Sequence, residues 1–259
     1  RAAGVHVSLE VLAAAGRAPK RHLRVQSISE WAPRMIGPYC QLTAHGGIAR
    51  TAGNLGFDSA TMELVSGGVR AECRAALAHC AAVLCAEGFA PRAATQLLVC
   101  HVGATNARAV GACVAGWLAR QRDRAANDAP EPPPPHVLHV EVASLPKAGL
   151  AEVAMEAVDE VVARVVACEP FRVVCSGCEL ECDVHAVVRR RGDAGGGDSD
   201  DDDDESPGGS VVAAQCVARN RRPDGPLDAE QVAGAARCAL RELEARGGRG
   251  AGAAAAALV

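Results

Sequence analysis

Three helix-breaking residues near the start of the chain, Pro33, Gly37 and Pro38, are the strongest constraint on its fold. Proline lacks a backbone N–H and biases the residue before it towards extended geometry. The segment between Trp31 and Pro38 therefore cannot be a regular helix. It predicts a loop that leads into Tyr39, where regular structure can begin.

A β-hairpin is predicted directly after this loop. Short, largely apolar runs at 39–45 and 48–55 are separated by Gly46-Gly47, a dipeptide that readily adopts the positive φ angles of a tight turn. A polar turn at 58–61 follows the hairpin, and Gly67-Gly68 precedes a run with helical periodicity. The order of elements is then loop, hairpin and helix.

Two amphipathic helices are predicted further along the chain. The first runs from Gly68 to Glu87 and is followed by Gly88, a residue type that commonly ends helices. In both helices, apolar residues recur at the spacing that places them on one face. They are Cys73, Leu77, Cys80 and Leu84 in the first helix, and Val110, Cys113, Val114, Trp117 and Leu118 in the second.

Four more segments have the pattern of strands, and the one at 95–102 is apolar almost throughout, as in strands buried on both faces. Together with the hairpin they give about six strands beside the two helices. This order predicts an α+β fold, a two-layer sandwich in which a mixed six-stranded sheet carries both helices on one face. The other three segments lie at 22–29, 137–144 and 150–158.

Several motifs on this framework resemble the RidA-like (enamine/imine deaminase) superfamily. They are WAPxxIGPYxQ from Trp31, AGxLGxDxxTxxLVxGGVxAE from Ala52 and VEVxxLPK from Val140. The resemblance covers roughly residues 21–158 and implies a chorismate-mutase-like fold. A longer motif from Val25, VQSISEWAPRMIGPY, is similar to the second RidA-like domain of eukaryotic diphthine-ammonia ligases.

The ligase resemblance implies ATP-dependent amidation of diphthine on elongation factor 2, in the cytoplasm, with that factor as the protein substrate. The triplet Ser66-Gly67-Gly68 mimics the start of the ligase phosphate loop, but Val69-Arg70 follows where that loop has lysine and aspartate. We therefore expect ATP to bind elsewhere in the parent protein and no cofactor to bind this chain. The alternative is an independent RidA-type deaminase of 2-iminoacids or enamines.

The RidA resemblance also implies a pocket between subunits, where an arginine holds the substrate carboxylate and polar residues position water. Tyr39 matches a tyrosine that lines this pocket. The arginine position is occupied by Val137, and an asparagine of the second helix falls on Gly111. Because valine cannot form the charge-assisted contact of a guanidinium with a carboxylate, the chain alone is expected to be inactive, and no residue is predicted to be catalytic.

A glutamate of the last strand completes the family pocket. In the simplest alignment its position falls on Ala154, and a small shift would select Glu152 or Glu156 instead. Glu152 is taken as the predicted pocket residue, together with Tyr39, Gly111 and Val137.

One cluster has the residue types of a metal site, namely Cys175, Cys178, Cys182 and His185. Three thiols and an imidazole suit tetrahedral zinc. The same region predicts a hairpin at 171–188, in which Cys182 and His185 would face opposite sides of one strand. We therefore predict packing thiols and no metal. A further strand is predicted at 211–217.

The chain divides into three predicted parts. Residues 1–15 resemble the last strand of a preceding RidA-like domain, residues 16–168 form the RidA-like domain, and residues 169–259 are a C-terminal extension. An acidic, glycine-rich run at 192–209 is expected to be disordered because it has too little apolar surface to bury. Since the chain begins with Arg1, we expect it to be part of a longer protein.

Composition limits the partners. The net charge of −4 gives no basic footprint for nucleic acid, and no apolar run of about 18 residues suggests a membrane span. The 12 cysteines, scattered through a chain of 259 residues, are typical of reduced thiols in a cytoplasmic protein. Because one face of the sheet has no helix over it, we expect pairing with another RidA-like domain or a homo-oligomer.

Overall fold

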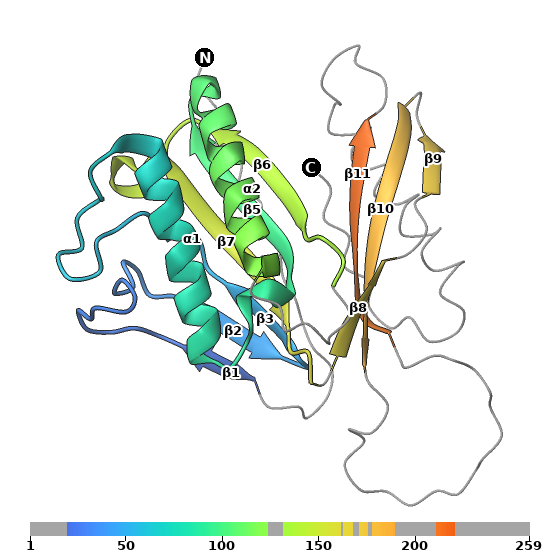
Figure 1. Cartoon of the computed structure of the whole chain (residues 1–259), viewed down its shortest axis with the longest axis horizontal. Coiled ribbons are helices and arrows are strands. Elements are labelled where there is room, and N and C mark those ends of the chain that lie inside the picture. The colour runs from blue at the N-terminus through green and yellow to red at the C-terminus, as the bar shows by residue number, and fades with distance from the viewer. Residues whose placement is uncertain are drawn as a thin grey trace, which may run out of the picture.

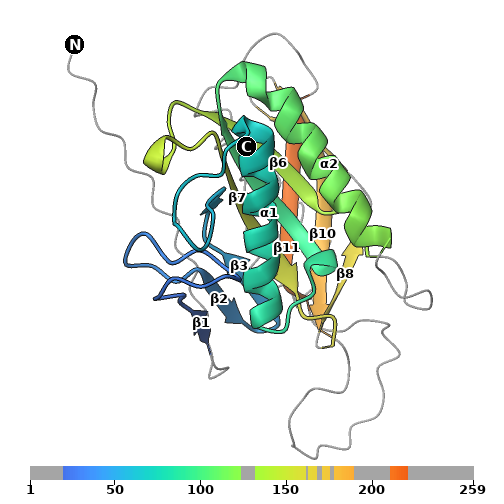
Figure 2. The ribbon, with the colours of Figure 1, turned by 60° about the vertical axis from the view of Figure 1, so that its left-hand side comes forward.

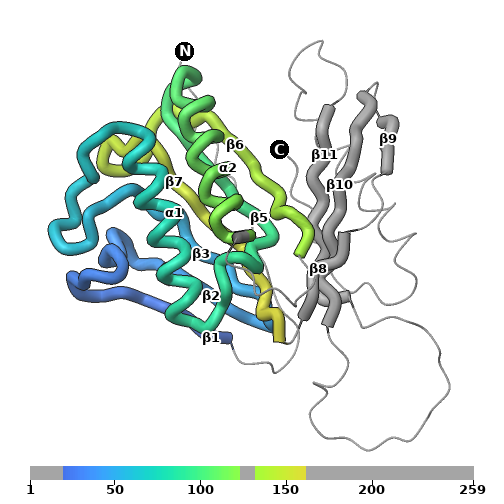
Figure 3. The backbone as a smooth tube through the Cα atoms, in the orientation of Figure 1, coloured from blue at the N-terminus to red at the C-terminus, as the bar shows by residue number. Residues whose placement is uncertain are grey.

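The computed structural model describes residues 20–123 and 132–161, which Figure 3 shows in colour, and the backbone of four more strands between residues 163 and 220. The predicted remnant strand within residues 1–15 and the acidic run at 192–209 lie outside the described residues. The predicted division into three parts depends on them and stays a prediction.

A mixed sheet of seven strands forms one layer of the fold (Figure 1). The strand order is β1-β2-β3-β7-β5-β6, and β4 also pairs with β7. Strands β5 and β6 are parallel, and the other described pairs of this sheet are antiparallel. The strands are β1 (Arg21–Leu23), β2 (Leu42–His45), β3 (Ile48–Thr51), β4 (Asn54–Leu55), β5 (Ala94–Val102), β6 (His136–Val142) and β7 (Ala151–Val158).

The predicted hairpin is confirmed. Strands β2 and β3 pair in antiparallel register around Gly46 and Gly47, whose φ angles are 58° and 80°. Both angles lie in the left-handed region that glycine adopts without strain. The sheet has seven strands rather than the predicted six because the second arm of the hairpin is interrupted at Ala52-Gly53, before pairing with β7 resumes in β4.

The first strand is shorter than predicted. It ends at Leu23, because the backbone of Val25 bonds outside the ladder. The Val25 N–H donates to Oε1 of the buried Gln41 side chain over 2.6 Å, and the Val25 carbonyl accepts from the N–H of Met35 over 3.0 Å. These long-range contacts stabilise residues 24–41 as a loop, which agrees with the loop predicted from the prolines.

Both helices lie on one face of the sheet, as predicted (Figures 1 and 2). Gly67 precedes α1 (Gly68–Ala86) with a φ of 112°, and Gly88 follows it with a φ of 82°. The triplet at 66–68 is thus the start of a helix. The second helix is α2 (Ala107–Asp123), and short 3-10 turns are η1 (Pro91–Ala93), η2 (Ala104–Asn106) and η3 (Pro146–Ala148).

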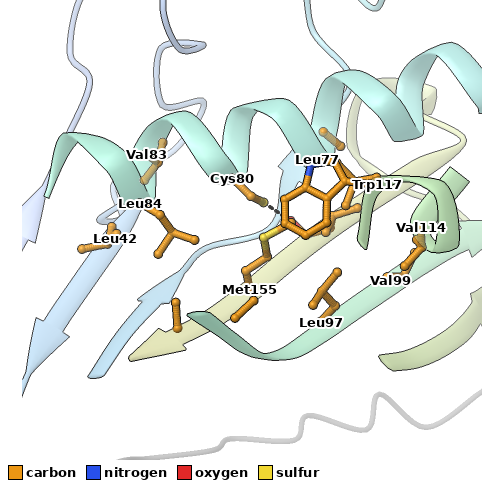
Figure 4. Packing of buried hydrophobic residues seen from close by; sticks show 14 of the residues in the cluster. Leu42, Leu77, Cys80, Val83, Leu84, Leu97, Val99, Val114, Trp117 and Met155 are labelled. Carbon is orange, nitrogen blue, oxygen red and sulfur yellow. Dashed lines mark hydrogen bonds between the residues drawn. The ribbon is translucent and has the colours of Figure 1, made fainter. Parts of the chain in front are cut away.

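The hydrophobic core fills the space between the helices and the sheet (Figure 4). Leu97 and Val99 of β5 are fully buried there, with Val153 of β7 beside them. All four residues of the predicted apolar face of α1 are fully buried, and Trp117 anchors α2. The predicted helix faces are confirmed, and α1 packs against α2 as well as against β7.

A second set of strands is described by its backbone alone. It consists of β8 (Ala163–Ala167), β9 (Phe171–Cys175), β10 (Cys178–Arg189) and β11 (Val211–Asn220). Strand β10 pairs in antiparallel register with each of the other three. The predicted hairpin at 171–188 and the predicted strand at 211–217 are confirmed.

Neighbouring leucines of β5 provide a test of the two faces of the sheet. Leu97 is fully buried in the core, whereas Leu98 is 36% exposed on the other face. Leu97→Ala should lower the free energy of unfolding by about 2–5 kcal/mol, because it removes buried methyl groups and leaves a cavity. Leu98→Ala should cost about 1 kcal/mol or less. Urea denaturation at low protein concentration measures both, and equal losses would contradict the assignment of faces.

Candidate functional site

Three candidates for the family glutamate, Glu152, Ala154 and Glu156, lie on the face of β7 that points away from the helices. The intervening residues face the helices and are at most 2% exposed, and side chains alternate along a strand. We call the side of the sheet opposite α1 and α2 the open face. Their partners on the neighbouring strand β5 are Cys100 for Glu152, Leu98 for Ala154 and Gln96 for Glu156.

Glu152 lies where the hairpin arm is interrupted. It pairs with Leu55 of β4 on one side and with Cys100 of β5 on the other. A Cβ added to Gly53 would collide with the Glu152 carboxyl, so the carboxyl lies directly against the backbone of this glycine. The missing side chain at Gly53 thus makes the room in which the Glu152 side chain is partly buried.

The electrostatics of Glu152 are those of a carboxyl without a counter-ion. Burial raises the pKa of Glu152 above its usual value. Among residues 20–123 and 132–161, no donor forms a hydrogen bond or ion pair with it. Burial, and then the Glu152 charge, also raise the pKa of the Cys100 thiol. A carboxyl that keeps its proton unusually well is suited to general acid–base work.

Glu156 differs from Glu152 although both lie on the same face of one strand. Its carboxylate forms an ion pair with Arg50 of β3, and Thr95 Oγ1 lies 3.4 Å from Glu156 Oε1. The charge of Glu156 is therefore neutralised within the sheet. Since Ala154 has no functional group, Glu152 is the one unpaired carboxyl among the three candidates.

Val137 lies on the opposite side of the sheet from Glu152. It pairs with the buried Leu97 and packs against the core beneath the helices. The side chain at the family arginine position therefore extends the hydrophobic core and supplies no charge. Within one chain, Val137 at the family arginine position and the Glu152 carboxyl are separated by the sheet.

Tyr39 and Gly111 occupy two further elements. Tyr39 lies in the loop before β2, half-buried, and its ring leaves only 3.1 Å to the place where Gly37 would carry a Cβ. Gly111 is in α2, and nothing lies within 4 Å of its own missing Cβ. The four predicted pocket residues thus lie on four separate elements, so their role as a pocket stays a prediction.

A hollow lies elsewhere, at the C-terminal end of α2, and contains none of the four predicted pocket residues. Proline side chains form much of its wall, so it offers few groups for chemistry. Its lining consists of Pro91, Arg92, Ala94, Leu118, Gln121, Arg122 and Pro132–Pro135.

Metal ligands do not cluster in the part of the chain whose side chains are described, where no group of three or more His, Cys, Asp or Glu residues could hold an ion. The cluster at 175–185 lies on β9 and β10, whose side chains are outside that part. Its backbone pairs Cys178 with Cys175 and Cys182 with Phe171. The prediction of packing thiols therefore remains untested.

No helix in the described residues has the length and apolar character needed to cross a membrane.

The raised pKa of Glu152 predicts a pH-dependent gain in stability when its charge is removed. The folded chain holds the Glu152 proton to a higher pH than the unfolded chain, so this group favours folding below its unfolded pKa. That contribution is lost as the pH rises through the folded pKa. Glu152→Gln should therefore be more stable than the unsubstituted chain at about pH 7, and the difference should shrink towards about pH 4.

Glu156→Gln is the matched control, because it removes a carboxylate from the same face of the same strand. It breaks the ion pair with Arg50 and should lower stability by about 0.5–1 kcal/mol at neutral pH. The urea midpoints of both variants and of the unsubstituted chain, measured at the two pH values, give these differences in stability. If Glu152→Gln followed the unsubstituted chain at both, the Glu152 carboxyl would not be penalised by burial.

Comparisons with known proteins identify relatives of this chain. A family described as endoribonuclease L-PSP matches residues 29–159. A putative endoribonuclease from Thermotoga maritima is 25% identical, with a TM-score of 0.45 over 54% of this chain and 98% of that chain. The YjgF gene product of E. coli is 26% identical, with a TM-score of 0.44 over 52% of this chain and 97% of that one.

No curated protein matches this chain at a comparable level of significance. The family match nevertheless extends over half of the chain and includes the loop, the hairpin, both helices and all strands from β2 to β7. The chain belongs to the endoribonuclease L-PSP family and has the RidA-like fold.

Proposed function

We propose that this chain is the RidA-like part of a diphthine-ammonia ligase, in which it acts as a binding and pairing module rather than as a hydrolase. The observation that carries the second half of this proposal is the position of Val137. A RidA-type hydrolase uses an arginine there to hold the substrate carboxylate, and here a valine packs against the core. Gly111 likewise offers no side chain to position water.

The ligase context is supported by the segment VQSISEWAP, whose residues divide into two kinds. Val25 is buried, and Ser29 Oγ donates to the Ala32 carbonyl over 2.7 Å, so both hold the loop in shape. Ile28 and Trp31 are 57% and 45% exposed. A rigid loop that displays large apolar side chains is suited to bind another protein surface. We assign these side chains to contact with elongation factor 2 or with a neighbouring domain of the ligase.

Pairing through the open face is the second part of the proposal. Both helices lie on the other side of the sheet, and Leu98 of β5 is 36% exposed on the open face. Another RidA-like domain, or a second copy of this chain, would bury this side of the sheet. In this account the ATP-dependent amidation takes place in a different domain of the ligase, and these residues contribute binding energy.

The alternative function is a RidA-type deaminase of 2-iminoacids, and Glu152 is the observation that favours it. In that reaction water adds to the imine carbon, the C–N bond breaks, and a 2-oxoacid and ammonia result. An unpaired carboxyl with a raised pKa is suited to take the proton from water and to return it to the leaving nitrogen. The alternative lacks a group to bind the substrate carboxylate.

The two functions predict opposite results for the purified chain. We expect it to bind elongation factor 2 that carries diphthine, and not to hydrolyse a 2-iminoacid generated in place from an amino acid. Trp31→Ala should weaken binding about tenfold, because exposed tryptophans are frequent anchors of interfaces. Biolayer interferometry and a coupled ammonia assay measure the two properties.

Val161→Ala is the control for binding. Val161 is 77% exposed at the turn after β7, so its substitution should leave the affinity for elongation factor 2 unchanged. Glu152→Gln is the control for hydrolysis. Robust hydrolysis by the unsubstituted chain that disappears in Glu152→Gln would establish the deaminase. Failure to bind elongation factor 2, whatever the hydrolysis result, would contradict the ligase assignment.

A further inference from the structure

Two cysteines from different helices meet at the edge of the core. Cys73 of α1 is fully buried, and Cys113 of α2 is 7% exposed. Cys113 Sγ lies 3.8 Å from the carbonyl oxygen of Arg70, which is one helical turn before Cys73 and on the same side of α1. The sulfur of Cys113 thus reaches across to the turn of α1 that carries Cys73, and Cys113 is close enough to Cys73 to raise the pKa of its thiol.

The other buried cysteine of α1 has different surroundings. Cys80 Sγ donates to the carbonyl of Val153 over 3.2 Å and accepts from Asn54 Nδ2 over 3.4 Å. The Cys80 thiol is therefore occupied by the backbone and side chains of the sheet. Within the described residues, Cys73 and Cys113, by contrast, form no hydrogen bond to the sheet, and each lies at the contact between α1 and α2.

We propose that Cys73 and Cys113 form a redox-active dithiol, which a peroxide converts into a disulfide clamp between α1 and α2. Packing alone does not require sulfur on both helices at one contact, because two small apolar side chains would fill the same space. Two neighbouring thiols, of which Cys113 belongs to the less deeply buried residue, provide both the attacking and the resolving sulfur of a disulfide.

The exposure of the two sulfurs sets the order of the steps. Burial, followed by the neighbouring Cys113, raises the pKa of Cys73 to about 12, so Cys73 remains a thiol at neutral pH. Cys113 is the less deeply buried of the two residues, at 7% exposed, so we assign to it the first reaction with peroxide. Its thiolate attacks one oxygen of hydrogen peroxide, the O–O bond breaks, and Cys113 becomes a sulfenic acid while water leaves.

The second step closes the clamp. The Cys73 sulfur attacks the Cys113 sulfur, the S–O bond breaks, and the departing hydroxide takes the Cys73 proton to leave as water. In total, two thiols and one peroxide give one disulfide and two water molecules, and two electrons pass from the sulfurs to the peroxide. A dithiol such as dithiothreitol reverses the change by thiol–disulfide exchange.

The clamp would tie together the two elements that cover the sheet. Residues 73 and 113 enclose most of α1, all of β5 and the start of α2, so the disulfide closes a long loop in the unfolded chain. Closing a long loop restricts the unfolded ensemble and stabilises the fold. We expect the melting temperature to rise by roughly 5–10 °C on oxidation and to return on reduction.

The test uses the full chain of 259 residues, fully reduced and then treated with hydrogen peroxide. Remaining thiols are alkylated, and a non-reducing digest is analysed by mass spectrometry. We expect one cross-linked peptide pair that contains Cys73 and Cys113, lighter by two hydrogen atoms than the sum of its reduced parts. Differential scanning fluorimetry should show the reversible rise in melting temperature.

Three variants make the result decisive. Cys113→Ser and Cys73→Ala should each abolish both the cross-link and the thermal shift, and circular dichroism verifies that each variant is folded. Cys85→Ser removes an exposed thiol from the same helix and should leave both signals intact. If Cys73 and Cys113 stayed alkylatable after peroxide treatment of the folded chain, or each joined a different cysteine, the proposal would be wrong.

Discussion

Everything in this domain depends on the alternation of side chains in β5 and β7, the two central strands that pair with each other. On the helix side, Leu97, Val99, Val153 and Met155 form the layer onto which α1 and α2 pack. The residues between them point to the open face. Because every strand residue must take one side or the other, the hydrophobic core and the candidate site are two sides of one pattern.

The same alternation separates two of the predicted pocket positions. It puts Val137 into the core and Glu152 on the open face, so the position of the missing anchor was filled by an apolar side chain that stabilises the helix layer. The pKa of Glu152 is raised because its carboxyl is partly buried against Gly53, and no cation among the described residues pairs with it. Glu156, four residues further along the same face of the strand, is neutralised by Arg50.

The sequence predicted those parts of the fold that depend on local spacing. Gly46-Gly47 and the apolar faces of α1 and α2 follow from turn chemistry and from helical periodicity, which neighbouring residues determine. The end of β1 at Leu23 was missed because contacts of Val25 with Gln41 and Met35 decide it, and these partners are distant in sequence. The difference between the paired Glu156 and the unpaired Glu152 required the position of Arg50, and the approach of Cys73 and Cys113 required the packing of two helices.

Helices α1 and α2 cover one face of the sheet, whereas the opposite face carries Leu98, which is 36% exposed, next to the buried Leu138. The oligomeric state of the chain shows whether this opposite face is an interface. Light scattering should show that the unsubstituted chain is an oligomer at micromolar concentrations. Leu98→Asp places a charge on the open face and should convert the oligomer to a monomer. Val161→Asp adds the same charge at an exposed turn and should leave the oligomer intact. An unsubstituted chain that is monomeric throughout this range, or an oligomer indifferent to Leu98→Asp, would contradict the account.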